Sequence, residues 1–144
     1  MGGSLRTVLG FDYGTKQIGA ALLQAPLDFA TPLCVHRSRD GKPDWVALEA
    51  LIKEWRPQIC VVGLALNMDG TSSDLAERCL RFSRQLEGRF AHEYNFSVEM
   101  QDERLSSVEA KELIAELHGN VDYRKVPADS LAAKIILERW QTKA

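Results

Sequence analysis

The sequence lacks any long hydrophobic run, and this limits where the chain can reside. No apolar run approaches the roughly 20 residues that a membrane-spanning helix needs, so no membrane span is predicted. The N-terminal segment MGGSLR also lacks the apolar stretch of a signal peptide. We therefore expect a cytoplasmic protein.

Cysteine is scarce, and the chain contains no CxxC pair. The three cysteines are an odd number, which argues against a disulfide framework and against a structural zinc site. Cys34, Cys60 and Cys79 each stand among apolar residues, so we expect them to be small core residues in a reduced protein.

An excess of positive charge is missing as well. The net charge of −2 gives no global attraction to nucleic acid. If nucleic acid is the partner, the attraction must come from local basic patches or from bound metal ions. This argues against a simple coating protein, but not against an enzyme that holds cations.

The overall amino-acid composition is typical of a globular domain. Hydrophobic residues make up 45% of the chain and charged residues 26%, which excludes a disordered chain. A chain of 144 residues can bury a substantial core, and it contains no repeat or linker. We expect a single domain over residues 1–144.

The segment GFDYGTKQIG at residues 10–19 predicts a hairpin. An apolar run ends at Asp12, a turn containing Gly14 follows, and a second apolar run begins at Ile18. Asp12 is the unusual member, because a carboxylate within a strand is costly to desolvate unless a partner compensates it. That partner can be a basic side chain, the amides of the turn or a bound cation.

The remaining pattern predicts a mixed α/β sheet of about five strands, the first three antiparallel, flanked by helices. Pro32 suggests an irregular or edge strand, and the continuous apolar run 59–64 suggests a central parallel strand. Thr71 and Asp74 have capping-box spacing at the start of a helix whose apolar stripe is Leu75, Cys79, Phe82 and Leu86. The expected elements after the hairpin are strand 29–37, helix 43–56, strand 59–64, a helix from about 71 to 86, strand 96–101, helix 106–117 and helix 128–140.

Three carboxylates stand at element ends, where function collects in α/β sheets. Asp12 ends the first strand, Glu103 follows the last strand, and Asp129 begins the last helix. Carboxylate oxygens suit hard divalent cations, and two such ions can promote phosphodiester cleavage. Each residue also has a purely structural interpretation: a turn acceptor for Asp12, a surface ion pair for Glu103, and complementation of the helix dipole for Asp129.

Four blocks of the sequence, in order, resemble the YqgF family, also called RuvX. They are GFDYGTKQIGAAL, VVGLALNMDGTSS, DERLSSVEA and DSLAAKIILERW, and the resemblance runs nearly end to end. It implies a ribonuclease H-like fold, with Asp12, Glu103 and Asp129 as catalytic carboxylates that bind Mg²⁺ or Mn²⁺. It also implies a cytoplasmic nuclease that processes the 5′ end of the 16S ribosomal RNA precursor, or alternatively a Holliday-junction resolvase acting on branched DNA.

Other residues in these blocks are candidates for contacts with structured RNA or branched DNA. Amides around Gly14 and Thr15 could meet a phosphate oxygen, and Lys16 and Arg104 could add positive charge beside the metal site. Asn67 stands after a central strand, a natural place for backbone contacts. The helix bearing Arg78, Arg81 and Arg84 could bind phosphate, although arginines on a helix surface are most often merely solvated.

Two other functions are compatible with the same sequence. The DYGT element is similar to the phosphate loop of actin-like and sugar-kinase proteins, but those proteins close two such domains around ATP and this chain provides length for one. A non-catalytic ribosome-assembly module would bind RNA through its arginines without needing metal. A homodimer would suit the two-fold symmetry of a DNA junction, although no feature of the sequence requires one.

Overall fold

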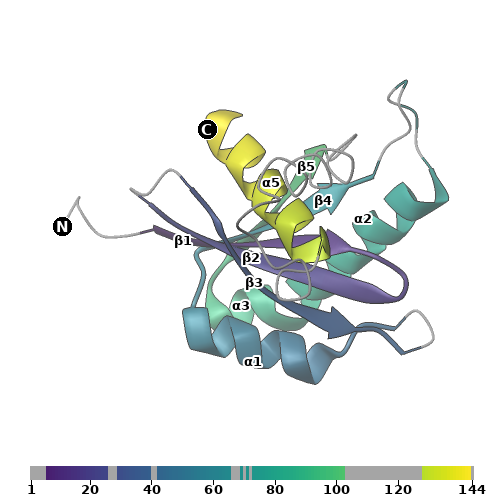
Figure 1. Cartoon of the computed structure of the whole chain (residues 1–144). Coiled ribbons are helices and arrows are strands. Elements are labelled where there is room, and N and C mark those ends of the chain that lie inside the picture. The colour runs from purple at the N-terminus through teal and green to yellow at the C-terminus, as the bar shows by residue number, and fades with distance from the viewer. Residues whose placement is uncertain are drawn as a thin grey trace.

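The described part of the chain is built on a five-stranded sheet with helices on both faces (Figure 1). The computed structural model describes residues 6–25, 29–39, 42–65, 69, 71, 73–102 and 128–143. The strand order β3-β2-β1-β4-β5 confirms the mixed sheet expected from the sequence. The strands are β1 (Arg6–Tyr13), β2 (Gln17–Ala25), β3 (Thr31–Arg37), β4 (Ile59–Leu64) and β5 (Ser97–Asp102). The helices are α1 (Trp45–Trp55), α2 (Asp74–Leu86), the π-helix η1 (Glu87–Ala91), α3 (His92–Tyr94) and α5 (Ala128–Lys143).

The first two strands form the hairpin that the sequence predicted. They pair antiparallel from Arg6 opposite Ala25 to Tyr13 opposite Ile18, with Asp12 opposite Gly19. β1 then pairs in parallel with β4, and β4 in parallel with β5. β1 therefore lies at the centre of the sheet, with an antiparallel neighbour on one side and a parallel neighbour on the other.

β3 is an edge strand with an irregularity at its proline. Ala20 pairs with Cys34 but Ala21 pairs with Pro32, so the residue between these two is left out of the register. This β-bulge confirms both expectations for Pro32, an edge position and a break in regular pairing. The strand begins at Thr31, two residues later than expected.

The two faces of the sheet pack against different helices. On one face, Leu9, Phe11 and Val62 pack with buried residues of α1 and α2. On the opposite face, Val8 and Val61 belong to a second core with α5, which crosses the sheet as Figure 1 shows. Alternate residues of each strand therefore face α1 and α2 or face α5.

Gly10 allows α5 to lie close to the centre of the sheet. A Cβ atom added at Gly10 would lie 2.4 Å from the Cγ atom of Leu137. Much of the surface of α5 is covered by the rest of the protein. Its buried residues are Leu131, Ala132, Ala133, Ile136, Leu137 and Trp140.

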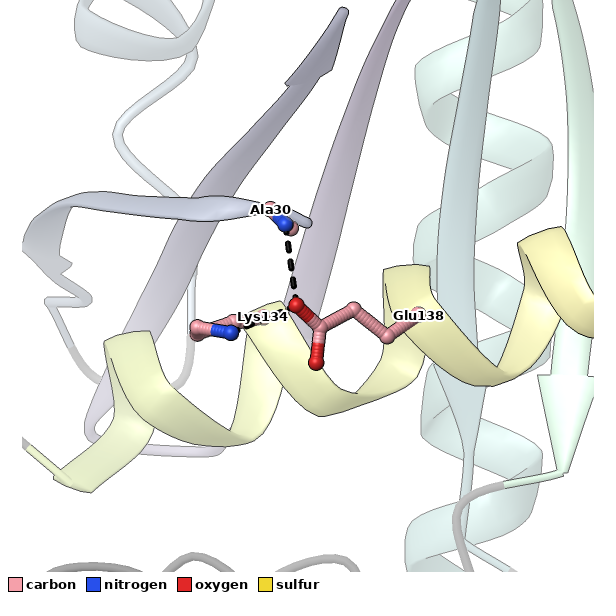
Figure 2. A network of polar contacts seen from close by, with 3 residues as sticks. All are labelled: Ala30, Lys134 and Glu138. Carbon is pink, nitrogen blue, oxygen red and sulfur yellow. Dashed lines mark hydrogen bonds and ion pairs between the residues drawn. The ribbon is translucent and has the colours of Figure 1, made fainter. Parts of the chain in front are cut away.

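Polar contacts also join α5 to the sheet. The backbone N–H of Ala30 donates to Oε2 of Glu138 at 2.9 Å, and Lys134 pairs with the same carboxylate from one helical turn away (Figure 2). Two residues further along the helix, the indole N–H of Trp140 donates to Oε1 of Glu99 on β5 at 2.9 Å. These contacts fix α5 relative to both edges of its sheet face.

The ends of the helices agree with the sequence at α1 but not at α2. Asp44 caps α1 by accepting from the Ala47 N–H at 3.1 Å, as the helix start at 43–44 implied. The expectation of a capping box at Thr71 is wrong: Ser73 is the cap of α2 and accepts from the Ala76 N–H at 2.9 Å. Thr71 instead donates its hydroxyl to Asp69 at 2.6 Å, which commits it to a local turn.

The apolar stripe predicted for α2 is also correct only in part. Cys79, Phe82 and Leu86 are buried, whereas Leu75 is 37% exposed and Ala76 is buried instead. The buried residues Ala76, Cys79, Ser83 and Leu86 recur at spacings of three and four residues, so the buried face begins at Ala76 and leaves Leu75 at its margin. The predicted helix 106–117 lies outside the described residues. Among the helices that the structure describes, none is long and apolar enough to cross a membrane.

Candidate active site at the ends of the central strands

Asp12 lies near the end of the central strand β1, where the carboxyl ends of three neighbouring strands come together. Phe11 pairs with Val62, and Val62 pairs with Met100, so β1, β4 and β5 run level with one another. All three strands run in the same direction, and β4 and β5 end at the pair Leu64 and Asp102. Asp12 is thus at the carboxyl ends of adjacent parallel strands, the position where α/β sheets collect ligands.

The side chain of Asp12 belongs to the face of the sheet that α5 covers. Val8 and Gly10 contact this helix, and Asp12 is the next residue in the alternation. It is half-buried, whereas its neighbours Phe11 and Tyr13 are buried on the opposite face. A half-buried carboxylate at a strand end remains accessible from solvent and can therefore serve as a ligand to a hard cation.

The turn after Asp12 requires glycine and presents two exposed side chains. A Cβ atom at Gly14 would lie 2.8 Å from the carbonyl oxygen of Gln17, closer than side chains tolerate. Thr15 and Lys16 are exposed. The backbone carbonyl of Lys16 accepts from the Ser38 N–H at 2.8 Å, so the turn is fixed to the end of β3.

The structure describes one of the three predicted carboxylate side chains. Asp129 is in the first turn of α5, but its side chain lies outside the described residues, and Glu103, Arg104 and Asn67 lie outside them altogether. Within the described residues, no group of three His, Cys, Asp or Glu side chains is arranged to hold a metal ion. The convergence of the three carboxylates stays a prediction.

Arg78 lies on the opposite side of the sheet from the side chain of Asp12. It lines an open hollow of about 650 Å³ beside α2, which we call the α2 hollow. Its lining side chains include Tyr13 and Phe82, which belong to the core on the α1 and α2 face. The structure therefore does not bring Arg78 to the face of Asp12, although Tyr13 lies next to Asp12 in the sequence.

The α2 hollow is also lined by Lys42, Trp45, Arg81 and Arg89. The sequence pattern did not predict that these four residues lie close together. A second hollow of about 780 Å³, the β3 hollow, is lined by Arg37, Ser38, Arg39, Lys42, Pro43 and Asp44. The two hollows share Lys42 and Pro43. Arg37, Arg39 and Lys42 are close together in the sequence, whereas Arg89 reaches the hollow from the π-helix η1, for which the sequence offers no pattern.

Comparison with known families identifies the chain. The family model described as RuvX, Holliday junction resolvase, matches residues 6–143. The chain belongs to the RuvX family. Several curated relatives carry the name "putative pre-16S rRNA nuclease". One from Azotobacter vinelandii is 50% identical over 135 residues, and the alignment covers 94% of this chain and 92% of the relative. One from Pseudomonas aeruginosa PAO1 is 51% identical over 138 residues with the same coverage.

Two solved structures of Holliday junction resolvases are similar to this RuvX family member. Thermus thermophilus RuvC in complex with a Holliday junction substrate aligns with a TM-score of 0.60 at 15% identity, over 96% of each chain. The fowlpox virus resolvase with Holliday junction DNA aligns with a TM-score of 0.57 at 12% identity, over 94% of this chain and 98% of that one. At these identities the likeness concerns the fold, and it confirms the expected ribonuclease H-like architecture.

Proposed function

We propose that this RuvX family member is a metal-dependent nuclease that processes the 5′ end of the 16S ribosomal RNA precursor in the cytoplasm. The observation that carries the proposal is the position of Asp12, half-buried where β1, β4 and β5 end together. The names of relatives near 50% identity support the choice of substrate.

The proposed metal ligands are Asp12, Glu103 and Asp129. The donor chemistry fits Mg²⁺ or Mn²⁺, because these hard cations prefer carboxylate oxygens and retain water ligands. Glu103 is the next residue after Asp102, which ends β5 beside the end of β4. Asp129 belongs to the first turn of α5, the helix on the face of Asp12. Bound divalent cations, two in our proposal, would activate the attacking water and stabilise the leaving oxygen.

The chain itself supplies binding and orientation around that centre. Thr15 and Lys16 are exposed in a turn that directly follows the strand of Asp12 and is fixed through Ser38. We infer that this turn, with the backbone at Gly14, contacts a phosphate next to the cleaved bond. Arg104 and Asn67 are included on sequence grounds, as a cation beside Glu103 and as a backbone contact after β4.

A second candidate substrate is branched DNA. The description of the RuvX family names Holliday junction resolvases, so the same carboxylates could cleave a four-way junction. This activity would favour a homodimer, because a junction presents two equivalent strands related by two-fold symmetry.

The test compares Asp12→Asn with the wild-type protein on both substrates. Purified proteins are offered a ribosomal RNA precursor and a four-way DNA junction, each with Mg²⁺, with Mn²⁺ and with a chelator. We expect metal-dependent cleavage, preferentially of the RNA, and a loss of about 100-fold or more in Asp12→Asn, because metal stabilisation of the transition state is worth several kcal/mol.

Asp74→Asn is the matched control, because Asp74 is an exposed carboxylate on α2, away from the face of Asp12. It should retain wild-type cleavage. Full activity in Asp12→Asn would contradict the proposal, and preference for the junction would reassign the substrate. Metal-independent RNA binding without cleavage by either protein would instead support an assembly module.

A further inference from the structure

The α2 hollow and the β3 hollow together form a continuous surface of positive charge. We call its six cationic residues the basic track. They are Arg37, Arg39, Lys42, Arg78, Arg81 and Arg89. Asp44 is the one carboxylate among the described lining residues of both hollows. The chain as a whole contains 18 Lys and Arg against 20 Asp and Glu, so this surface is strongly enriched in positive charge.

The α2 end of the track has an aromatic floor that holds one of its arginines. Trp45 stacks on Phe82 with ring centroids 5.6 Å apart and an interplanar angle of 17°. The guanidinium carbon of Arg89 lies 4.5 Å from the centroid of the Trp45 ring. A guanidinium stacked in this way keeps its in-plane N–H donors available, and those donors match the oxygens of a phosphate.

The cations of this end have no ion-pair partner among the carboxylates that the structure describes. Within the described part of the chain, Arg78, Arg81 and Arg89 form no ion pair with Asp or Glu. All three are exposed, and they project from α2 and from the π-helix that continues it. Unpaired arginines around a concave surface create a positive potential that attracts anions.

The β3 end of the track lies beside the candidate active site. Backbone hydrogen bonds of 2.9 Å in both directions between Arg39 and Lys42 fix the loop that carries these two cations. Ser38, between Arg37 and Arg39, donates its N–H to the carbonyl of Lys16 in the turn after Asp12. The hydroxyl oxygen of Ser38 is buried and has no hydrogen-bond partner among the described residues.

We propose that the basic track binds the phosphate backbone of the substrate strand beyond the bond that is cleaved. The strand would pass from Asp12 over the turn at Gly14–Lys16, and then along the β3 hollow into the α2 hollow. Successive phosphates along a strand provide the repeated negative charge that a line of cations requires. The identification of the ligand as nucleic acid rests on the proposed function. The binding of polyanions by the basic track does not depend on it.

The test measures binding separately from cleavage. A fluorescent single-stranded RNA that extends past the cleavage point is titrated in metal-free buffer at several salt concentrations, using Arg81→Gln and Arg84→Gln in the wild-type and Asp12→Asn backgrounds. Arg84 is the matched control, because it is an exposed arginine of the same helix that does not line either hollow. Circular dichroism verifies that all variants are folded.

We expect Arg81→Gln to weaken binding about tenfold and to lower the slope of log K against log salt by about one, in both backgrounds. In cleavage assays its KM should rise while kcat is retained. Arg84→Gln should match the wild type. Equal behaviour of Arg81→Gln and Arg84→Gln would overturn the proposal, as would equally tight binding of a mononucleotide, which would indicate a nucleotide site. If Asp12→Asn still cleaved the substrate while Arg81→Gln still weakened binding, the proposed catalytic site would be refuted. The proposed binding of phosphates by the basic track would then still hold.

Discussion

Gly10 and Asp12 lie on the face of β1 that α5 covers, and each has a different role there. Gly10 has no side chain, so Leu137 occupies the space where a Cβ atom would lie. Asp12, two residues further on, has a carboxylate on the same face at the point where the strand ends. The sequence showed an unusual carboxylate in a strand. It did not show that Gly10 is needed for close packing, because the contact with Leu137 joins residues far apart in the chain.

Gly10→Ala should destabilise the protein. The added methyl group would overlap Leu137, and overpacking of this kind costs about 1–3 kcal/mol. Gly88→Ala is the control, because the space around Gly88 is open within 4 Å and alanine favours helix by about 0.5–1 kcal/mol. Urea denaturation measures both changes. If Gly10→Ala and the wild type had the same free energy of unfolding, α5 could shift away from β1 without a loss of stability.

The elements that the sequence predicted best are those with a strong local signal. The hairpin, the buried strand 59–64 and the helix capped by Asp44 follow from apolar runs and a capping residue. The start of α2 was predicted poorly, because Thr71 and Ser73 are both suitable caps. Tertiary contact decided between them: Ser73 also donates its hydroxyl to the carbonyl of Ala65 after β4, at 2.6 Å. The π-helix η1, in which Phe90 is buried and contacts Trp45, has no local sequence signal from which it could be predicted.

Replacing Ser73 by alanine should therefore lower stability more than replacing Thr71. Ser73→Ala removes the cap of α2 and the bond to Ala65, which we expect to cost about 1 kcal/mol or somewhat more. Thr71→Ala removes an exposed contact with Asp69, and we expect a change within about 0.5 kcal/mol. Thermal denaturation of the two variants makes the comparison. The reverse order would indicate that the loop around Thr71, rather than the cap, determines where α2 begins.

At the scale of the whole molecule, composition predicted the fold class but not the distribution of charge. The net charge of −2 suggested that any attraction to nucleic acid had to be local. The structure places the segment that carries Arg37 and Lys42 beside α2 and the π-helix that carries Arg89, around two adjoining hollows. No linear pattern contains that information, since it arises from the packing of β3, α1 and α2. The convergence of Asp12, Glu103 and Asp129 stays a prediction for the same reason.

The expected single domain predicts one cooperative unfolding transition, which the cysteines can report. Cys60 and Cys79 are fully buried, and burial raises the pKa of the Cys60 thiol well above its ordinary value. Alkylation requires an accessible thiolate, so both should react only after unfolding. Cys34 is half-buried on the edge strand, and burial, reinforced by the charge of Glu54, raises its pKa less strongly.

At pH 8 we expect slow alkylation of Cys34 in the native protein. Labelling of Cys60 and Cys79 should rise with urea concentration together with the loss of circular dichroism. Mass spectrometry of digested samples assigns each site. Labelling of either buried cysteine before the loss of circular dichroism would reveal a part of the chain that opens independently.

The bulge at Pro32 also bears on how copies of this protein can associate. An open sheet edge offers a regular row of N–H and C=O groups to a strand from another molecule. In β3 the proline supplies no N–H, and the bulge beside it interrupts the spacing of the remaining groups. Growth of the sheet from one molecule into the next is therefore disfavoured through β3. A homodimer that cleaves one junction should therefore form through a surface other than the β3 edge.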